Sequence, residues 1–108
     1  MNKFPDDETG NTLSLFEENG FDLSRPLEMD FFVAVPSERS GVKVAERVRE
    51  IGFQVTVEKD EETAEWTCYC TKKMVPGYAE VVSVEKELDK IARIYGGRSD
   101  GFGSYGNQ

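Results

Sequence analysis

The chain has 108 residues, of which 38% are hydrophobic and 11% aromatic, and its 21 acidic and 13 basic side chains give a formal net charge of −8. This length suits one domain, and the apolar content is enough to fill a core, so a wholly disordered chain is excluded. The acidic excess disfavours nucleic acid as a partner and favours a basic one.

Met1 is followed by polar and acidic residues rather than by a basic run and an apolar stretch. No apolar segment approaches the length that would cross a bilayer. We therefore expect a soluble, cytoplasmic protein that makes no membrane contact.

The first predicted element is a helix over residues 6–19. Its first turn is acidic, which suits the positive end of the helix dipole. Gly20 can adopt the left-handed conformation that ends a helix, with Phe21 folding back onto the last turn.

Residues 27–35 give the strongest strand pattern in the chain, because apolar side chains occupy every second position. These side chains are Leu27, Met29, Phe31, Val33 and Val35. All five lie on one face of a strand, so we expect that face to be covered by helices.

Residues 38–51 have apolar side chains at helical spacing and predict a second helix. The segments 53–58 and 66–71 alternate in polarity, and a charged turn at residues 59–63 separates them. Together they predict a β-hairpin with an acidic tip.

The third predicted helix begins near Pro76, which suits a first helical turn. Its apolar stripe is formed by Val81, Val84, Leu88, Ile91 and Tyr95. The glycine-rich residues 98–108 follow and predict a short, irregular edge strand.

This order of elements predicts an α+β fold: a ferredoxin-like βαββαβ sandwich, with a four-stranded antiparallel sheet and two helices on one face. An extra helix precedes it. We expect a single domain over residues 1–108, made of an acidic N-terminal helix and arm (residues 1–22) and the ferredoxin-like body (residues 27–108).

Cys68 and Cys70 alternate in the third predicted strand, so their side chains share a face about 7 Å apart, which disfavours a mutual disulfide. The sequence contains no His, which removes the commonest base for a cysteine nucleophile and the usual zinc ligand sets. The acidic run at residues 60–62 lacks the spacing of a calcium loop. We therefore expect a protein that is not an enzyme and has no catalytic residue, metal or cofactor.

The negative charge is concentrated in two segments. Residues 1–30 hold eight acids and two bases, and residues 58–65 hold five acids and one base. The candidate partner-binding acids in them are Asp6, Asp7, Glu8, Asp60, Glu61 and Glu62. Such patches suit a basic partner.

A sheet of this order can also present aromatic side chains for base stacking, and Phe32 and Tyr69 would lie on the face away from the two helices. An RNA-binding sheet needs Lys and Arg around its aromatics, whereas this chain is acidic. We also expect the first helix to cover that face, with Leu13, Leu15 and Phe16 over the two rings.

Four stretches of the chain, taken in this order, resemble a known family. They are ENGFDLSRPLEMDFFVAVP, REIGFQV, EWTCYCTKKM followed by VP, and YGGRSDGFGSYG. The last includes Asp100, Gly101, Phe102, Gly103, Ser104 and Tyr105. The chain resembles the regulators of ribonuclease E activity B, or RraB-type ribonuclease E inhibitors.

The resemblance implies a ferredoxin-like fold and a cytoplasmic protein that binds the endoribonuclease RNase E, or its scaffold region, and lowers its cleavage of transcripts. It implies that arginine-rich segments of RNase E could engage an acidic surface. It also makes Asp100, Phe102 and Tyr105 candidate partner-binding residues, and it supplies no catalytic residue.

Our leading hypothesis is therefore a protein-binding regulator of RNA decay, and we expect a monomer rather than a dimer. One alternative is a small-molecule-binding ferredoxin-like module that dimerises through its sheet. Another is an RNA-binding sheet platform.

Overall fold

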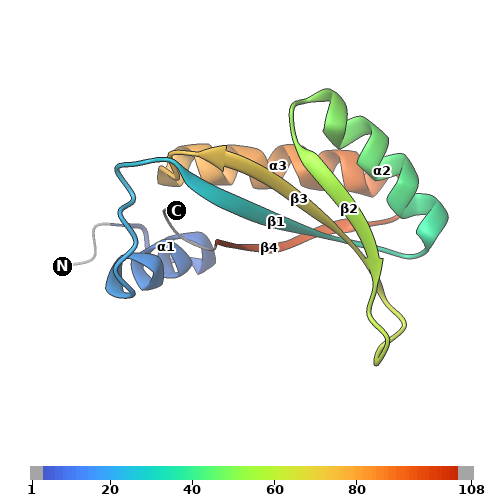
Figure 1. The fold of residues 1–108 in the computed structure, drawn as a ribbon, viewed down its shortest axis with the longest axis horizontal. Helices are drawn as coiled ribbons and strands as arrows, with labels where there is room; N and C mark the ends of the chain where they lie inside the picture. Colours follow the sequence, from blue (N-terminus) through green and yellow to red (C-terminus); the bar gives the residue numbers. More distant parts are fainter. Residues whose placement is uncertain (1–3, 105–108) are drawn as a thin grey trace.

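A computed structural model describes residues 4–104, which form three helices and four strands (Figure 1). In chain order these are α1 (Glu8–Glu18), β1 (Leu27–Val35), α2 (Glu38–Glu50), β2 (Gln54–Lys59), β3 (Trp66–Met74), α3 (Tyr78–Ile94) and β4 (Arg98–Ser104). The strands form one antiparallel sheet in the order β2-β3-β1-β4. The predicted α+β fold, with a ferredoxin-like order and an additional N-terminal helix, is confirmed.

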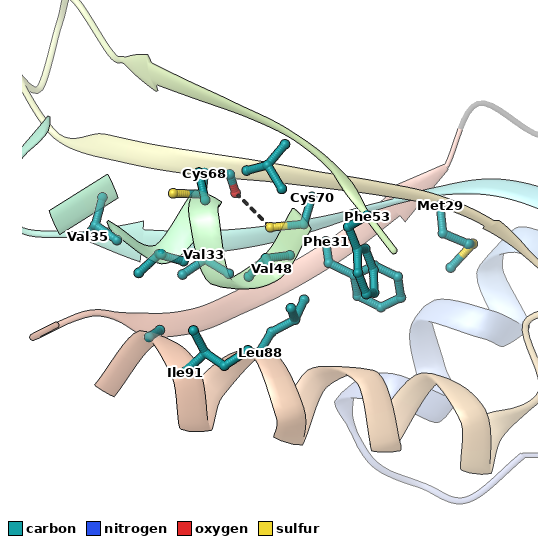
Figure 2. Close-up of a cluster of buried hydrophobic side chains, with 14 of the residues drawn as sticks. Met29, Phe31, Val33, Val35, Val48, Phe53, Cys68, Cys70, Leu88 and Ile91 are labelled. Atoms are coloured by element: carbon teal, nitrogen blue, oxygen red, sulfur yellow. Dashed lines mark hydrogen bonds between the residues drawn. The ribbon is translucent and has the colours of Figure 1, made fainter. Parts of the chain in front are cut away.

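β1 is a central strand, paired with β3 on one side and with β4 on the other. Its five alternating apolar side chains are all buried, as predicted. They face α2 and α3, which cover one side of the sheet (Figure 2). In Figure 2, Phe31 and Val33 point from the sheet toward Leu88 and Ile91 of α3.

α1 lies beside α3, at the end of the sheet where β1 begins and β4 ends (Figure 1). The prediction that α1 covers Phe32 and Tyr69 is wrong. Leu13 instead joins the core on the helix-covered side, while Leu15 is 55% exposed. The apolar spacing within a helix identifies its buried stripe but not the surface that the stripe meets.

The ends of α1 follow from local chemistry. Asp7 is the N-cap and its carboxylate accepts a hydrogen bond of 2.7 Å from the Gly10 amide, so the helix begins two residues later than predicted. Gly20 has a φ of 87°, and the Phe21 amide bonds to the Phe16 carbonyl at 3.0 Å. This is the closure predicted from the sequence.

α3 also begins two residues later than predicted, at Tyr78, with Gly77 as its N-cap. Pro76 precedes the helix and is buried instead of forming its first turn. The apolar stripe of α3 is placed as predicted, with Val81, Leu88 and Ile91 buried.

β4 is an edge strand, and its pairing with β1 is irregular between Phe31 and Val33. At this irregularity Gly101 has a φ of 94°, a conformation that side chains other than Gly rarely adopt. The predicted irregular edge strand is therefore present, and its irregularity is a bulge opposite Phe32.

We predict that Leu13→Ala lowers the free energy of unfolding by about 2–5 kcal/mol, the usual effect of truncating a fully buried leucine. Leu15→Ala makes the same change two residues along the same helix at an exposed position, and should cost less than about 1 kcal/mol. Urea unfolding followed by circular dichroism measures both. Equal losses from the two variants would contradict the observed placement of α1.

Candidate partner-binding surfaces

The three N-terminal acids lie at the start of α1 and differ in what they contact. Asp6 and Glu8 are exposed. Asp7 caps the helix and also accepts a hydrogen bond from the Tyr78 hydroxyl of α3. That bond, followed by the one from the Gly10 amide, lowers the pKa of Asp7. Asp7 therefore helps to hold α1 in place, and Asp6 and Glu8 are the acids available to a partner.

The hairpin between β2 and β3 ends in the acidic tip, which projects from the body in Figure 1. The Asp60 carboxylate accepts bonds from the backbone amides of Glu62 and Thr63, at 2.8 and 3.2 Å. Asp60 therefore shapes the turn. Glu61 and Glu62 are exposed, so their side chains can change without loss of those bonds.

The C-terminal candidates are also engaged within the protein. Asp100 is paired with Arg98 at 2.8 Å. Phe102 is partly buried between Phe16 and Phe31, with ring centroids 5.8 and 5.9 Å away. Tyr105 lies outside the described residues.

A groove of about 680 Å³ between α1, α3 and β4 brings together three of the predicted residues, Glu8, Asp100 and Phe102. Its remaining lining residues are Thr9, Thr12, Phe32, Glu85, Lys86, Asp89, Lys90, Arg98, Ser99 and Gly101. The acidic tip is not part of this groove, and Figure 1 places it at the opposite end of the molecule from α1. The predicted residues therefore form at least two separate surfaces.

The α3 residues that line the groove were not among the site residues predicted from the sequence. Glu85 and Asp89 are separated by one helical turn and flank the apolar stripe of α3, where both are partly buried. In the sequence, charged residues at this spacing are typical of a solvated helix face. Only the packing of α1 beside α3 shows that this face is partly enclosed. The Thr9 hydroxyl donates a 2.7 Å hydrogen bond to Glu85, and the Ser99 amide donates a 2.9 Å bond to Asp89.

The Glu85 carboxyl is partly buried, and this desolvation is the main cause that raises its pKa. The bond from Thr9 opposes the rise, and the nearby charges of Glu8 and Asp7 add to it. An acid whose pKa is raised by folding destabilises the folded state when it is ionised. Ionised Glu85 therefore lowers the free energy of unfolding at pH values above its raised pKa. This loss disappears as the pH falls through the raised pKa toward the ordinary value and the carboxyl becomes protonated.

The second face of the sheet is not covered by a helix within the described part of the chain. Here Phe32 of β1 and Tyr69 of β3 are paired across the strands, with ring centroids 5.7 Å apart and an interplanar angle of 78°. Both rings are partly exposed. Two aromatic rings on the central strands could serve as a base-stacking platform. Because α1 does not cover them, the position of α1 gives no argument against RNA binding.

The charges around this aromatic pair still argue against RNA binding. Residues opposite one another in an antiparallel sheet share a face, so strand pairing identifies the charged side chains here. The acids are Glu28, Asp30, Glu58 and Asp100, and the bases are Lys73 and Arg98. Since the two bases are outnumbered and Arg98 is paired with Asp100, this face is poorly suited to a polyanion.

The two thiols face the core from β3. Burial raises the pKa of Cys68 to about 11 and that of Cys70 to about 12. The Cys68 thiol contacts the Gly41 carbonyl oxygen at 3.4 Å. Both thiols are therefore protonated at neutral pH and are poor nucleophiles.

Two further observations concern residues 4–104. No three potential ligands among their Cys, Asp and Glu side chains lie close enough to hold a metal ion. No helix in this part of the chain is long and apolar enough to cross a membrane.

We predict that Glu85→Gln makes the protein more stable at pH 7, by less than about 1 kcal/mol because the carboxyl is only partly buried. Glutamine keeps an oxygen that can accept the Thr9 bond but carries no charge to desolvate. Urea unfolding at pH 7 and pH 4 should show the gain at pH 7 and a smaller gain at pH 4. Glu87→Gln, an exposed change on the same helix, should not reproduce this pattern, and an equal gain from it at pH 7 would contradict the role of burial.

We predict that iodoacetamide at pH 8 modifies Cys68 and Cys70 at least about tenfold more slowly in the native protein than in urea, because the thiolate is the reactive form. Mass spectrometry of the alkylated protein follows the reaction. Comparable rates in the two conditions would show that the thiols are accessible in the native state.

Comparison with known protein families gives a match over residues 6–104, nearly the whole chain, to the family described as regulator of ribonuclease activity B, RraB. No curated protein matches the chain. The matched region contains every described element, from α1 to β4. The chain therefore belongs to the RraB family, the regulators of ribonuclease activity B.

Proposed function

We propose that this protein is a non-enzymatic cytoplasmic regulator that binds RNase E and lowers its cleavage of transcripts. The observation that carries this proposal is the family match over residues 6–104, because the family regulates a ribonuclease activity and so implies a protein partner. The choice of RNase E rests on the resemblance of the sequence to ribonuclease E inhibitors.

The charge of the protein supports a basic partner. Exposed acids lie at the start of α1, where Asp6 and Glu8 are available, and at the acidic tip, where Glu61 and Glu62 are available. Acidic patches of this kind accelerate encounter with a basic surface and make the association dependent on ionic strength. Asp7, Asp60, Asp100 and Phe102 remain candidate contacts, although each also has a structural partner.

The chemistry of the thiols supports a regulator rather than an enzyme with a cysteine nucleophile. Cys68 and Cys70, the strongest potential nucleophiles, are buried and protonated. We propose that the protein acts as a monomer that engages RNase E through its surface, with residues 1–108 as one domain.

We predict that the purified protein is captured by immobilised RNase E and slows its cleavage of an RNA substrate, while causing no cleavage alone. Glu61→Lys/Glu62→Lys should weaken capture several-fold if the acidic tip is used, and the loss should diminish as salt screens the charges. Asp60 is left unchanged so that the turn is preserved. Asp6→Lys/Glu8→Lys tests the N-terminal acids in the same way, with Asp7 retained.

The matched control is Glu46→Lys/Glu50→Lys, which makes the same charge change on the exposed side of α2. Failure of the wild-type protein to bind RNase E would end the proposal. Binding that neither acidic variant alters would leave RNase E as the partner and exclude both acidic segments as the main contact. Sedimentation of the protein alone tests the monomer.

A further inference from the structure

The open sheet face combines two partly exposed aromatic rings with more acidic than basic side chains. Phe32 and Tyr69 occupy neighbouring positions on the two central strands. Their nearly perpendicular rings, 78° apart, present one ring face beside one ring edge. Such a pair offers a flat cation a π surface to stack on.

Two glycines of β4 lie on the flank of Phe32 toward the edge of the sheet. Gly103 lies beside the ring, and a Cβ at that position would be 3.4 Å from Phe32 Cζ. Gly101, at the bulge, lines the groove together with Phe32. The two glycines therefore leave the ring accessible from the edge of the sheet.

The carboxylates on this face lie around the rings. Asp30 is two residues before Phe32 on β1, and its carboxylate is held by a hydrogen bond from the Thr71 hydroxyl of β3. Glu58 of β2 is exposed and lies opposite Thr67, two residues from Tyr69, whereas the exposed Glu28 lies further along β1, opposite Lys73. A cation stacked on the rings would thus lie among carboxylates that can accept its hydrogen bonds.

The acidic character continues past the edge of the sheet. Phe32 also lines the groove that contains Glu8, Glu85 and Asp89. An extended segment crossing the open face could therefore continue over the β4 bulge and toward α1. The groove lining has a small acidic excess, with four acids (Glu8, Glu85, Asp89 and Asp100) and three bases (Lys86, Lys90 and Arg98).

We propose that the open sheet face binds an extended, arginine-bearing protein segment, with a guanidinium group stacked on the Phe32–Tyr69 pair and hydrogen-bonded by the carboxylates around it. Arginine fits better than lysine, because its planar guanidinium stacks on aromatic rings and binds carboxylates in a fork geometry. This inference rests on the proposed function only in taking the partner to be a protein, and it adds the binding face and the side chain that is recognised.

The test uses two synthetic peptides that differ only in having arginine or lysine at four spaced positions in a Gly/Ser background. Calorimetry measures the affinity of the full chain for each, and amide NMR shifts locate the contact. We expect the arginine peptide to bind several-fold more tightly than the lysine peptide, with shifts at and around Phe32 and Tyr69.

The key variant is Phe32→Leu/Tyr69→Leu, which keeps apolar bulk on the sheet but removes the π surfaces. It should weaken the arginine peptide about tenfold and reduce the preference for arginine over lysine. Glu28→Lys/Glu58→Lys should also weaken binding, whereas Glu46→Lys/Glu50→Lys on α2 should not. Urea unfolding of each variant establishes that it is folded.

Several results would overturn the proposal. They are unchanged affinity in the leucine variant, shifts confined to the acidic tip or the start of α1, and tighter binding of single-stranded RNA than of the arginine peptide on this face. Self-association through this face, detected by sedimentation and abolished in the leucine variant, would also overturn it.

Capture by RNase E separates this inference from the proposed function. If RNase E is captured equally by the wild type and the leucine variant, the inference fails and the proposed function stands. If the arginine peptide binds the open face but RNase E is not captured, the proposed partner fails and the inference stands.

Discussion

The packing of Phe31 on the central strand is the contact on which the arrangement of the other elements depends. Its ring meets Phe53, just before β2, with centroids 6.2 Å apart, and Phe102 of β4 at 5.9 Å. Phe102 in turn meets Phe16 of α1, and Phe16 meets Phe21 at 5.2 Å. This series of aromatic contacts links α1, β4 and the start of β2 to one buried ring, so the N-terminal helix is joined to the core through β4 in addition to its packing against α3.

The central strand and the order of elements could be predicted because they depend on local periodicity. β1 was located at its observed bounds, since an alternation of five apolar residues fits only a strand with one covered face. The position of α1 could not be found in this way. It is set by the burial of Leu13 and by two hydrogen bonds, from Thr9 to Glu85 and from Tyr78 to Asp7. Each of these bonds joins residues more than seventy positions apart in the sequence.

Charge counting located the acidic segments but could not distinguish acids that display charge from acids that hold the chain in place. Asp7 caps a helix and Asp60 orders a turn, whereas Glu61 and Glu62 beside Asp60 are exposed. The short side chain of Asp reaches its own backbone, while Glu extends beyond it. A stretch of acids in a turn therefore contains both kinds, and the Glu residues are the better candidates for contact with a partner.

Phe31 and Phe32 show how one register determines both the stability of the sheet and the surface that it displays. Successive side chains on a strand point to opposite faces, so Phe31 is buried under the helices while Phe32 is partly exposed beside Tyr69. β1 is paired on both sides, and a slip of one residue would expose the core and bury Asp30 and Glu28. The burial of the core thus fixes the register that aligns Phe32 with Tyr69. The bulge at Gly101 lies opposite Phe32 and interrupts only the pairing of the edge strand β4 with β1. The pairing of the two central strands, β1 and β3, is continuous beside the ring.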